Sequence, residues 1–325
     1  MSVSVVIPAL NAGDFIVRAI DSALSQGRVL HEVIVVDDGS TDDTGAVVSD
    51  ISRRDPRLRL VKLPTNQGPG PARNAGFATA TGDWIAILDA DDVYLPRRLD
   101  YLVEKAEQLN LDFAADNILF FDHTAHRVSR IGIRPEIIGA VLYLNRYEFV
   151  KNCCGTSDAK MDFGLLQPIV RTSFLRRQNL SYPPIRHGED FAFCLKGLLA
   201  GGRLGVFPEA YYMVTERTGS ISGKSSPLTR TAVDFGGMER HAREMAEVAQ
   251  ANGDRELAEL LFKRANHMLR TSLIRQVKNH WKSRQLHNCA RLVCTDRRAL
   301  TACFEAGFRK VLQMAQKEDR EPASV

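Results

Sequence analysis

Three carboxylates follow an apolar run near residue 90. Residues 85–92 read IAILDADD, so Asp89, Asp91 and Asp92 come directly after a segment typical of a buried β-strand. Carboxylates this close repel one another by about 1 kcal/mol or more per pair unless a cation neutralises them. Oxygen ligands without His or Cys favour Mg²⁺ or Mn²⁺, which share their shell with water and phosphate oxygens. The segment predicts a divalent-metal site, and the alternative is a solvated acidic turn before Pro96.

A second acidic segment, VVDDGSTDDT at residues 35–44, also follows an apolar run. Thr41 and Asp42 are typical of a turn that caps a helix. Capping does not explain Asp37 and Asp38, which stand at the end of the expected strand. A carboxylate there can accept the N3 hydrogen of a uracil ring, in a charge-assisted bond of about 1.5–3 kcal/mol.

A glycine-rich segment, NQGPGPARNAG at residues 66–76, leads into an expected helix. Gly68 and Gly70 permit close approach of the backbone to a ligand, and Arg73 supplies a fixed positive charge. The alternative for Arg73 is a surface charge on a helix. The segment is neither a GxGxxG fingerprint nor a Walker loop.

Two acidic residues, Glu189 and Asp190, stand at the head of an expected helix at residues 188–199. Acidic side chains in a first helical turn can simply complement the helix dipole. They can also serve as a general base, a role that typically contributes ~10²–10⁴-fold to a rate. His187 is interpreted as a local hydrogen-bonding partner.

The elements that must position these residues alternate between short apolar runs and amphipathic stretches, as in a parallel sheet covered by helices. The expected strands are residues 4–7, 32–36, 58–63 and 84–88, followed by a hairpin of 113–121 with 127–133, a strand at 165–171 and the helix at 188–199. Residues 217–227 are rich in Gly and Ser and predict a mobile loop. In open α/β sheets ligands lie beyond the carboxyl ends of the strands, where both acidic segments fall.

The composition is that of an ordinary globular protein, with 325 residues, 44% hydrophobic and 25% charged. No window offers the ~18 apolar residues of a membrane span and no signal peptide is recognised, so a cytosolic protein is expected. The six cysteines form no CxxC pair and are expected to be buried, reduced thiols. A metal held by Cys289, Cys294 and Cys303 is the alternative, although their spacing better fits the faces of helices.

In their order and intervals, PALNAG, EVIVVDDGSTDDT, NQGPGPARNAG, GDWIAILDADD and HGEDF resemble the motifs of family 2 glycosyltransferases with the GT-A fold, notably bacterial exopolysaccharide enzymes of the succinoglycan type. The resemblance covers residues 3 to about 225. It implies an α/β catalytic domain at 1–227, with a nucleotide-binding half at 1–110 and an acceptor half at 111–227. From Leu228 onward the pattern of apolar residues itself predicts a helical region, at 228–325. The implied site residues are Pro8 and Asn11 along the nucleotide, Asp38 on uracil with Arg73 near it, Asp89 toward the ribose, Asp91 on the metal and diphosphate, Asp190 as general base with Glu189 in reserve, and Arg217 in a loop that closes over the donor.

The resemblance implies an inverting, Mn²⁺- or Mg²⁺-dependent enzyme that transfers one sugar, with glucose expected, from a UDP-sugar to a glycan or lipid-linked acceptor. No QxxRW motif of processive relatives is present. Thymine shares the N3 hydrogen of uracil, so a dTDP donor is open. Two other functions are weighed: a haloacid-dehalogenase-like phosphatase with Asp89 as nucleophile and Asp91 as acid, and a binding protein without activity. In that phosphatase family the motif normally stands at the start of the fold. Here three expected strands come before it and the fourth runs into it.

The C-terminal region is basic, since residues 261–325 hold 14 Lys and Arg against 5 Asp and Glu. With Trp281 and several leucines, these helices could lie on the cytoplasmic face of an anionic inner membrane, where a polyprenyl-linked acceptor would be found. Packing on the catalytic domain and a homodimer interface are the alternatives. Nucleic acid binding is not expected, because no recognised module is present and the rest of the chain is acidic.

Overall fold

The computed structural model describes residues 1–154, 161–216 and 233–282. The chain divides into two compact units, Met1–Val233 and Asp234–Val325. The boundary predicted after residue 227 falls within 217–232, outside the described residues.

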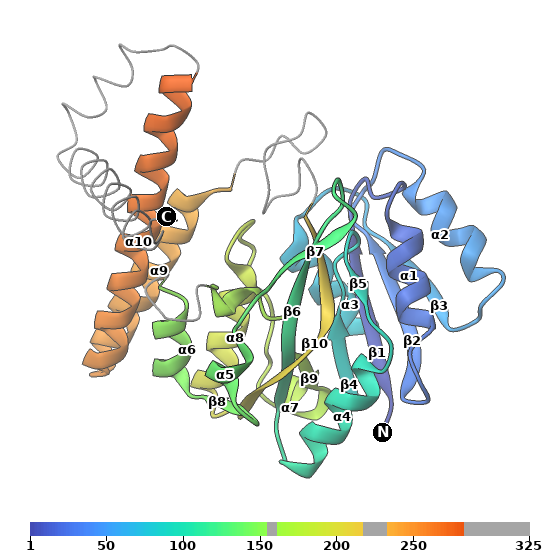
Figure 1. Cartoon of the computed structure of the whole chain (residues 1–325), viewed down its shortest axis with the longest axis horizontal. Helices are drawn as coiled ribbons and strands as arrows, with labels where there is room; N and C mark the ends of the chain where they lie inside the picture. The colour runs from blue at the N-terminus through green and yellow to red at the C-terminus, as the bar shows by residue number, and fades with distance from the viewer. Residues whose placement is uncertain (155–160, 217–232, 283–325) are drawn as a thin grey trace, which may run out of the picture. The chain divides into compact units, whose positions relative to one another are not determined.

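The first unit opens with parallel strands in the order β3-β2-β1-β4. These are β1 (Val3–Ala9), β2 (Leu30–Asp37), β3 (Leu58–Lys62) and β4 (Trp84–Ile87), connected through α1 (Ile16–Leu24), α2 (Thr44–Ser52) and α3 (Pro69–Thr79). Val5, Val6 and Ile7 have no exposed surface, which explains the continuous apolar runs, since strands of a parallel sheet are covered on both faces. The prediction of an α/β fold with a mostly parallel sheet flanked by helices is confirmed (Figure 1).

Beyond β4 the sheet continues in the order β9-β6-β10-β5, where β9 runs antiparallel to its neighbours and β6 and β10 are parallel. The strands are β5 (Val93–Tyr94), β6 (Phe113–Asp122), β9 (Ile169–Arg171) and β10 (Leu204–Glu216), with β7 (Arg127–Ile131) on β6 and β8 (Leu142–Leu144) on β10. The predicted hairpin is present as β6 and β7. This half places β10 beside the acidic segment that follows β4, because β10 also pairs with β5.

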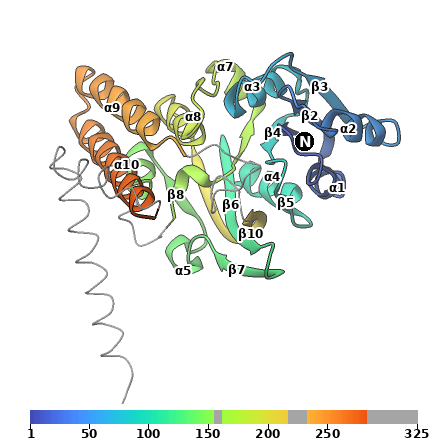
Figure 2. The same ribbon diagram turned by 90° about the horizontal axis from the view of Figure 1, so that it is seen from above.

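Helices cover both faces of the sheet (Figure 2). The view shows α3, α7 (Thr172–Arg177) and α8 (Glu189–Leu199) along one face, and α1 and α4 (Arg98–Gln108) along the other. Helix α3 lies very close to β1, because a Cβ atom at Gly76 would come within 2.2 Å of Val6 Cγ1. A glycine is therefore required at this position of the NQGPGPARNAG segment.

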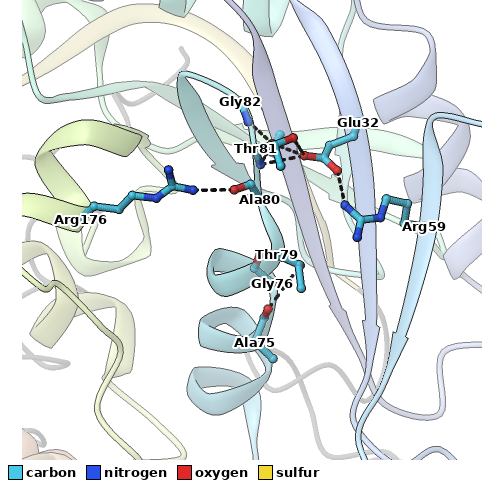
Figure 3. Close-up of polar contacts among 10 residues, drawn as sticks. Glu32, Arg59, Ala75, Gly76, Thr79, Ala80, Thr81, Gly82 and Arg176 are labelled. Atoms are coloured by element: carbon cyan, nitrogen blue, oxygen red, sulfur yellow. Dashed lines mark hydrogen bonds and ion pairs between the residues drawn. The ribbon is translucent and has the colours of Figure 1, made fainter.

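A buried carboxylate, Glu32, fixes the amino ends of the central strands (Figure 3). It accepts hydrogen bonds from the Ser4 hydroxyl at 2.8 Å and the Thr81 amide at 2.9 Å, and it pairs with Arg59 at 2.9 Å. Burial raises the pKa of Glu32, but the hydrogen bonds from Thr81, Ser4 and Arg59 together outweigh burial and lower it to about 2. This network lies at the amino ends of the strands, opposite the carboxyl ends where the predicted site residues lie. We therefore infer that it stabilises the fold and does not bind a ligand.

Two segments differ from the sequence predictions. The strand expected at residues 165–171 spans only Ile169–Arg171, because the Asp162 side chain accepts a hydrogen bond from the Gly164 amide at 2.8 Å and begins a 3₁₀ turn at Phe163–Leu165. The thirteen-residue strand β10 was not predicted. It contains Pro208 and its register on β6 is irregular near Ala210, which interrupts the alternation that marks a strand.

The remaining helices of the first unit are short: α5 (Pro135–Ile138) and α6 (Arg146–Asn152). Cys153, Cys154 and Cys194 are buried thiols, as predicted, whereas Cys289, Cys294 and Cys303 lie outside the described residues.

In the second unit, α9 (Phe235–Ala251) and α10 (Arg255–Lys282) pack against each other, which confirms a helical C-terminal region. Over the part of the chain that the structure describes, every helix is too short or too polar to cross a membrane.

Candidate active site

The carboxyl ends of β1, β2 and β4 meet at one edge of the sheet. Ala9 is opposite Asp37 in the β1–β2 register, and the Asp38 amide donates to the Ala9 carbonyl at 2.8 Å. On the other side of β1, the Leu88 amide donates to the Val6 carbonyl at 3.1 Å. The edge therefore joins the segments after β1, β2 and β4, which carry most of the predicted site residues.

Asn11 connects the first two of these segments. Its side-chain oxygen accepts a hydrogen bond from the Thr41 amide at 2.8 Å, and its own amide donates to the Ser40 hydroxyl at 2.9 Å. Its backbone has a positive φ of 48°, a conformation that Asn tolerates better than most residues. Pro8 is half-buried at the end of β1, opposite Val36. Contact of Pro8 and Asn11 with a nucleotide stays a prediction.

Asp38 joins the end of β2 to the start of α3. Its carboxylate is 3% exposed and accepts hydrogen bonds from the Gln67 and Gly68 amides, both at 2.8 Å. Gly68 has a φ of 99°, which favours glycine. A carboxylate has about four lone-pair sites, so Asp38 retains the capacity to accept the uracil N3 hydrogen as well. That contact stays a prediction.

Arg73 lies at the centre of the site and binds carboxylates from two distant segments. Its Nη2 atom lies 2.9 Å from Oδ1 of Asp89, and its Nη1 atom lies 2.8 Å from Oε1 of Glu189 and 3.1 Å from Oδ1 of Asp190. The Arg73 side chain is 3% exposed, so these ion pairs form in a low dielectric. One guanidinium therefore connects the acidic segment after β4 with the head of α8. Its predicted place near the uracil stays a prediction.

Asp190 has a strongly perturbed proton affinity. Burial raises the pKa of its carboxyl to about 8, Arg73 opposes the rise, and the negative charges of Glu189 and Asp89 add to it. A hydrogen bond with Tyr182 also lowers this pKa. Perturbed carboxyls of this kind gather at functional sites, since a general base works best with a pKa near the working pH.

Tyr182 is a contact of Asp190 that the sequence analysis missed. Its ring stacks on Phe193 with centroids 4.3 Å apart, and the guanidinium of Arg73 lies 5.1 Å from its centroid. Its backbone is fixed by two hydrogen bonds of 2.9 Å with the Asn74 side chain. A tyrosine shortly before HGED was a local signal, but nothing in the sequence linked it to Arg73.

The acidic segment after β4 is held by β10. The Tyr212 hydroxyl donates to Oδ2 of Asp92 at 2.9 Å, and the Thr215 amide donates to Oδ1 at 2.9 Å. Burial, with the charges of Asp91 and Asp89, raises the pKa of Asp92 well above its usual range. Tyr212 and Thr215 were missed because β10 was not predicted.

The residues present fit a divalent metal that the donor completes. Asp91 is half-buried, and the Asp89 side chain is 33% exposed. No group of three His, Cys, Asp or Glu suited to a metal occurs within the described ranges. Mg²⁺ and Mn²⁺ need only one or two carboxylates when phosphate oxygens and water supply the other ligands. Asp91, with the second oxygen of Asp89, would hold such an ion. Arg217, which was predicted to lie in a loop over the donor, is outside the described residues.

The first part of the chain matches a known family. The sequence profile described as "Glycosyl transferase family 2" matches residues 4–163. A glycosyltransferase of Haemophilus influenzae without an assigned role is 30% identical over 204 residues, which cover 60% of this chain and 72% of that protein. The chain belongs to glycosyl transferase family 2. The predicted family is thereby confirmed, and the phosphatase alternative is set aside.

Two relatives in this family carry names that refer to a process. The succinoglycan biosynthesis proteins ExoO and ExoU of Rhizobium meliloti are 38% identical over 232 residues and 36% identical over 227 residues. Each alignment covers 68% of this chain, and the chain spans 62% of ExoO and 64% of ExoU. The similarity therefore covers less than two thirds of either relative.

Solved structures of this fold are also similar. TarS 1–349 from S. aureus in complex with UDP-GlcNAc has a TM-score of 0.62 at 20% identity, over 90% of each chain. Another TarS structure has a TM-score of 0.61 at 22% identity, over 82% of this chain and 43% of that one. At this identity the likeness establishes the fold alone, and it agrees with the GT-A fold predicted from the motifs.

Proposed function

We propose that this protein is an inverting, metal-dependent glycosyltransferase that transfers one sugar from a UDP-sugar to a glycan or lipid-linked acceptor. The observation that carries the proposal is the bridge formed by Arg73, whose guanidinium binds Asp89 at 2.9 Å and lies 3.1 Å from Asp190. Asp89 belongs to the segment suited to bind a metal and a diphosphate. Asp190 is suited to act as a general base, because burial raises its pKa. Arg73 thus connects a donor side with an acceptor side.

Asp190 is a better candidate for the base than Glu189. Glu189 Oε1 accepts a hydrogen bond from Arg73 at 2.8 Å, and its side chain is 9% exposed. The Asp190 side chain is 18% exposed, twice the exposed fraction of Glu189. An acceptor hydroxyl therefore reaches Asp190 more readily, while Glu189 holds Arg73.

The reaction is a single displacement at the anomeric carbon. The acceptor oxygen attacks from the face opposite UDP, its proton passes to Asp190, and the bond from the anomeric carbon to the diphosphate breaks with its electron pair on the diphosphate. An α-linked donor then gives a β product. A metal ion, when bound, offsets the negative charge that builds up on the departing diphosphate.

The substrate class is proposed from the relatives. ExoO and ExoU are named for succinoglycan biosynthesis, and TarS has been solved with UDP-GlcNAc and with UDP. By analogy we propose a role in exopolysaccharide synthesis with a uridine diphosphate sugar. UDP-glucose is the first donor to test, in a thermal-shift screen of UDP- and dTDP-sugars with Mn²⁺ that also decides the nucleotide.

The function is tested by comparing Asp190→Asn with Glu189→Gln. Asp190→Asn is expected to abolish sugar transfer while its affinity for UDP with Mn²⁺ stays within about twofold of wild type. Glu189→Gln, the matched control at the neighbouring position, is expected to retain measurable transfer. Normal turnover by Asp190→Asn would show that Asp190 is not the general base. Failure of the wild-type protein to bind UDP in the presence of Mn²⁺ would contradict a UDP-sugar as the donor.

The peripheral membrane contact and the homodimer stay predictions, since residues 283–325 lie outside the described residues. Flotation with liposomes that contain anionic lipid, using the full chain and a chain that ends at residue 260, tests the membrane contact. Equal partitioning of both forms would contradict it.

A further inference from the structure

The third carboxylate of the acidic segment, Asp92, has no part in the proposed reaction. It is 5% exposed, in contrast to the Asp89 side chain, which is 33% exposed. Both Asp92 oxygens accept hydrogen bonds from β10, one from the Tyr212 hydroxyl and one from the Thr215 amide, each at 2.9 Å. A carboxylate buried and bonded in this way is not placed to bind a donor, so its function must be sought in what it holds.

The Tyr212 hydroxyl connects both ends of the acidic turn. Besides donating to Asp92, it accepts a hydrogen bond from the Asp89 amide at 3.2 Å. The Asp92 amide in turn donates to the Asp89 carbonyl at 3.0 Å, which closes the turn. Asp91 therefore lies in a turn whose first and last residues are bound to the same hydroxyl.

Tyr212 is itself fixed by its surroundings. It is 1% exposed, and its ring packs edge-on against Tyr94 with centroids 5.7 Å apart. The Arg98 guanidinium lies 5.0 Å from the Tyr212 centroid and pairs with the buried Asp116 at 2.8 Å. Because β10 also pairs with β5 at Tyr212 and Tyr94, the hydroxyl has little freedom to move.

We propose that Asp92 and Tyr212 are positioning residues, which hold the turn of Asp89 and Asp91 in the geometry that binds a nucleoside diphosphate and its divalent cation. This inference rests on the proposed function. Adjacent carboxylates repel one another, so an unsupported turn would spread them apart when no cation is present. Support from buried partners keeps ligands preorganised, and loss of such partners typically weakens metal binding 10–100-fold.

The test compares Tyr212→Phe with Tyr101→Phe in the full chain. Tyr101 also bonds a carboxylate, Glu209, but from α4 and away from the acidic turn. For Tyr212→Phe we expect the Kd for UDP in saturating Mn²⁺ to rise about tenfold by calorimetry, and the half-saturating Mn²⁺ concentration to rise in parallel. Tyr101→Phe is expected to bind like wild type. With saturating donor and Mn²⁺, kcat of Tyr212→Phe should stay within about threefold of wild type.

A second variant, Asp92→Asn, keeps the inference testable if Tyr212→Phe fails to fold. Asp92→Asn keeps the size of the side chain but replaces one of its two accepting oxygens with an NH2 group, which cannot accept a hydrogen bond from Tyr212 or Thr215, so it should also weaken UDP binding. The double variant should be no more than about twofold weaker than the weaker single variant, because both substitutions break the same contact.

The outcomes separate the inference from the proposed function. If wild type binds UDP with Mn²⁺ and Tyr212→Phe and Asp92→Asn bind it equally well, the inference is overturned and the proposed function stands. If a variant loses kcat in proportion to its folded fraction while its Kd for UDP stays unchanged, the role is structural only and the inference is again overturned. If wild type itself binds no UDP, both are overturned.

Discussion

The guanidinium of Arg73 lies 3.1 Å from the carboxylate of Asp190, although the two residues come from helices far apart in the chain. Arg73 also pairs with Asp89 and Glu189, so a single positive charge stands among three carboxylates. The cluster has an excess of negative charge; burial is the main cause that raises the pKa of Asp190, and the charges of Glu189 and Asp89 add to it while Arg73 opposes it. Binding of a cation beside Asp89 would lessen that excess, and so the donor and the base are electrostatically coupled.

Arg73→Met is expected to lower stability, and more so at higher pH. Without the guanidinium, Asp89, Glu189 and Asp190 lose their cation, and removing one partner of buried ion pairs typically costs about 3–5 kcal/mol. The folded-state pKa of Asp190, already raised to about 8, would then lie further above its unfolded value, so stability is lost as pH rises through it.

Urea unfolding of Arg73→Met and wild type at pH 6 and pH 8.5 measures this effect. The difference in unfolding free energy should widen at pH 8.5. Arg59→Met, which removes a half-exposed partner of Glu32 at the other end of the sheet, is the control, and its effect should not grow across this range. A gap for Arg73→Met that narrows with pH would contradict the assigned charges.

The pH dependence of transfer is expected to report Asp190. Because its pKa is raised to about 8 and the base acts deprotonated, kcat/KM for the donor should rise about tenfold per pH unit below pH 8 and level off above it. Glu189→Gln removes a neighbouring negative charge that raises this pKa, so the midpoint should move to lower pH. A profile flat from pH 6 to 9, or unmoved by Glu189→Gln, would contradict this role.

The strands near the amino terminus could be predicted because the information is local. In β1 and β2, runs of Val and Ile stand next to the acidic and glycine-rich segments that end them, so pattern and motif agree. The partners of the site could not be predicted in this way. Arg73 and Glu189 are 116 residues apart, and Tyr212 and Asp92 are 120 apart. Only the sheet order, with β10 beside β5 and β6, brings such residues together.

Asp38→Asn is expected to weaken UDP binding about 10–100-fold while leaving CDP binding unchanged or stronger. The uracil N3 carries a hydrogen for the Asp38 carboxylate, whereas the cytosine N3 is an acceptor that an amide can donate to. Calorimetry with both nucleotides measures the difference. Asp37→Asn, at a carboxylate that accepts the Ser40 amide at 2.9 Å, is the control. Equal weakening of UDP and CDP would mean that Asp38 acts by holding the Gln67 and Gly68 amides, not by reading the base.

Glu32→Gln is expected to destabilise the first unit near neutral pH and to lose this effect in acid. The folded-state pKa of Glu32 is lowered from 4.5 to about 2, so the unfolded chain takes up the proton first as pH falls. By linkage, the charged carboxyl contributes on the order of 3 kcal/mol, which is fully present above pH 4.5 and is lost as pH falls toward 2. The gap in unfolding free energy between wild type and Glu32→Gln should therefore be constant from pH 7 to 5.5 and narrow below pH 4.5.

Urea unfolding in a Trp281→Phe background measures this gap, since Trp84, fully buried in β4, is then the single fluorescent tryptophan. Asp50→Asn, which breaks an exposed pair with Arg53, is the control and should change stability by less than about 1 kcal/mol. A Glu32→Gln gap of equal size at pH 4 and pH 7 would show that the side chain acts by its packing and not by its charge.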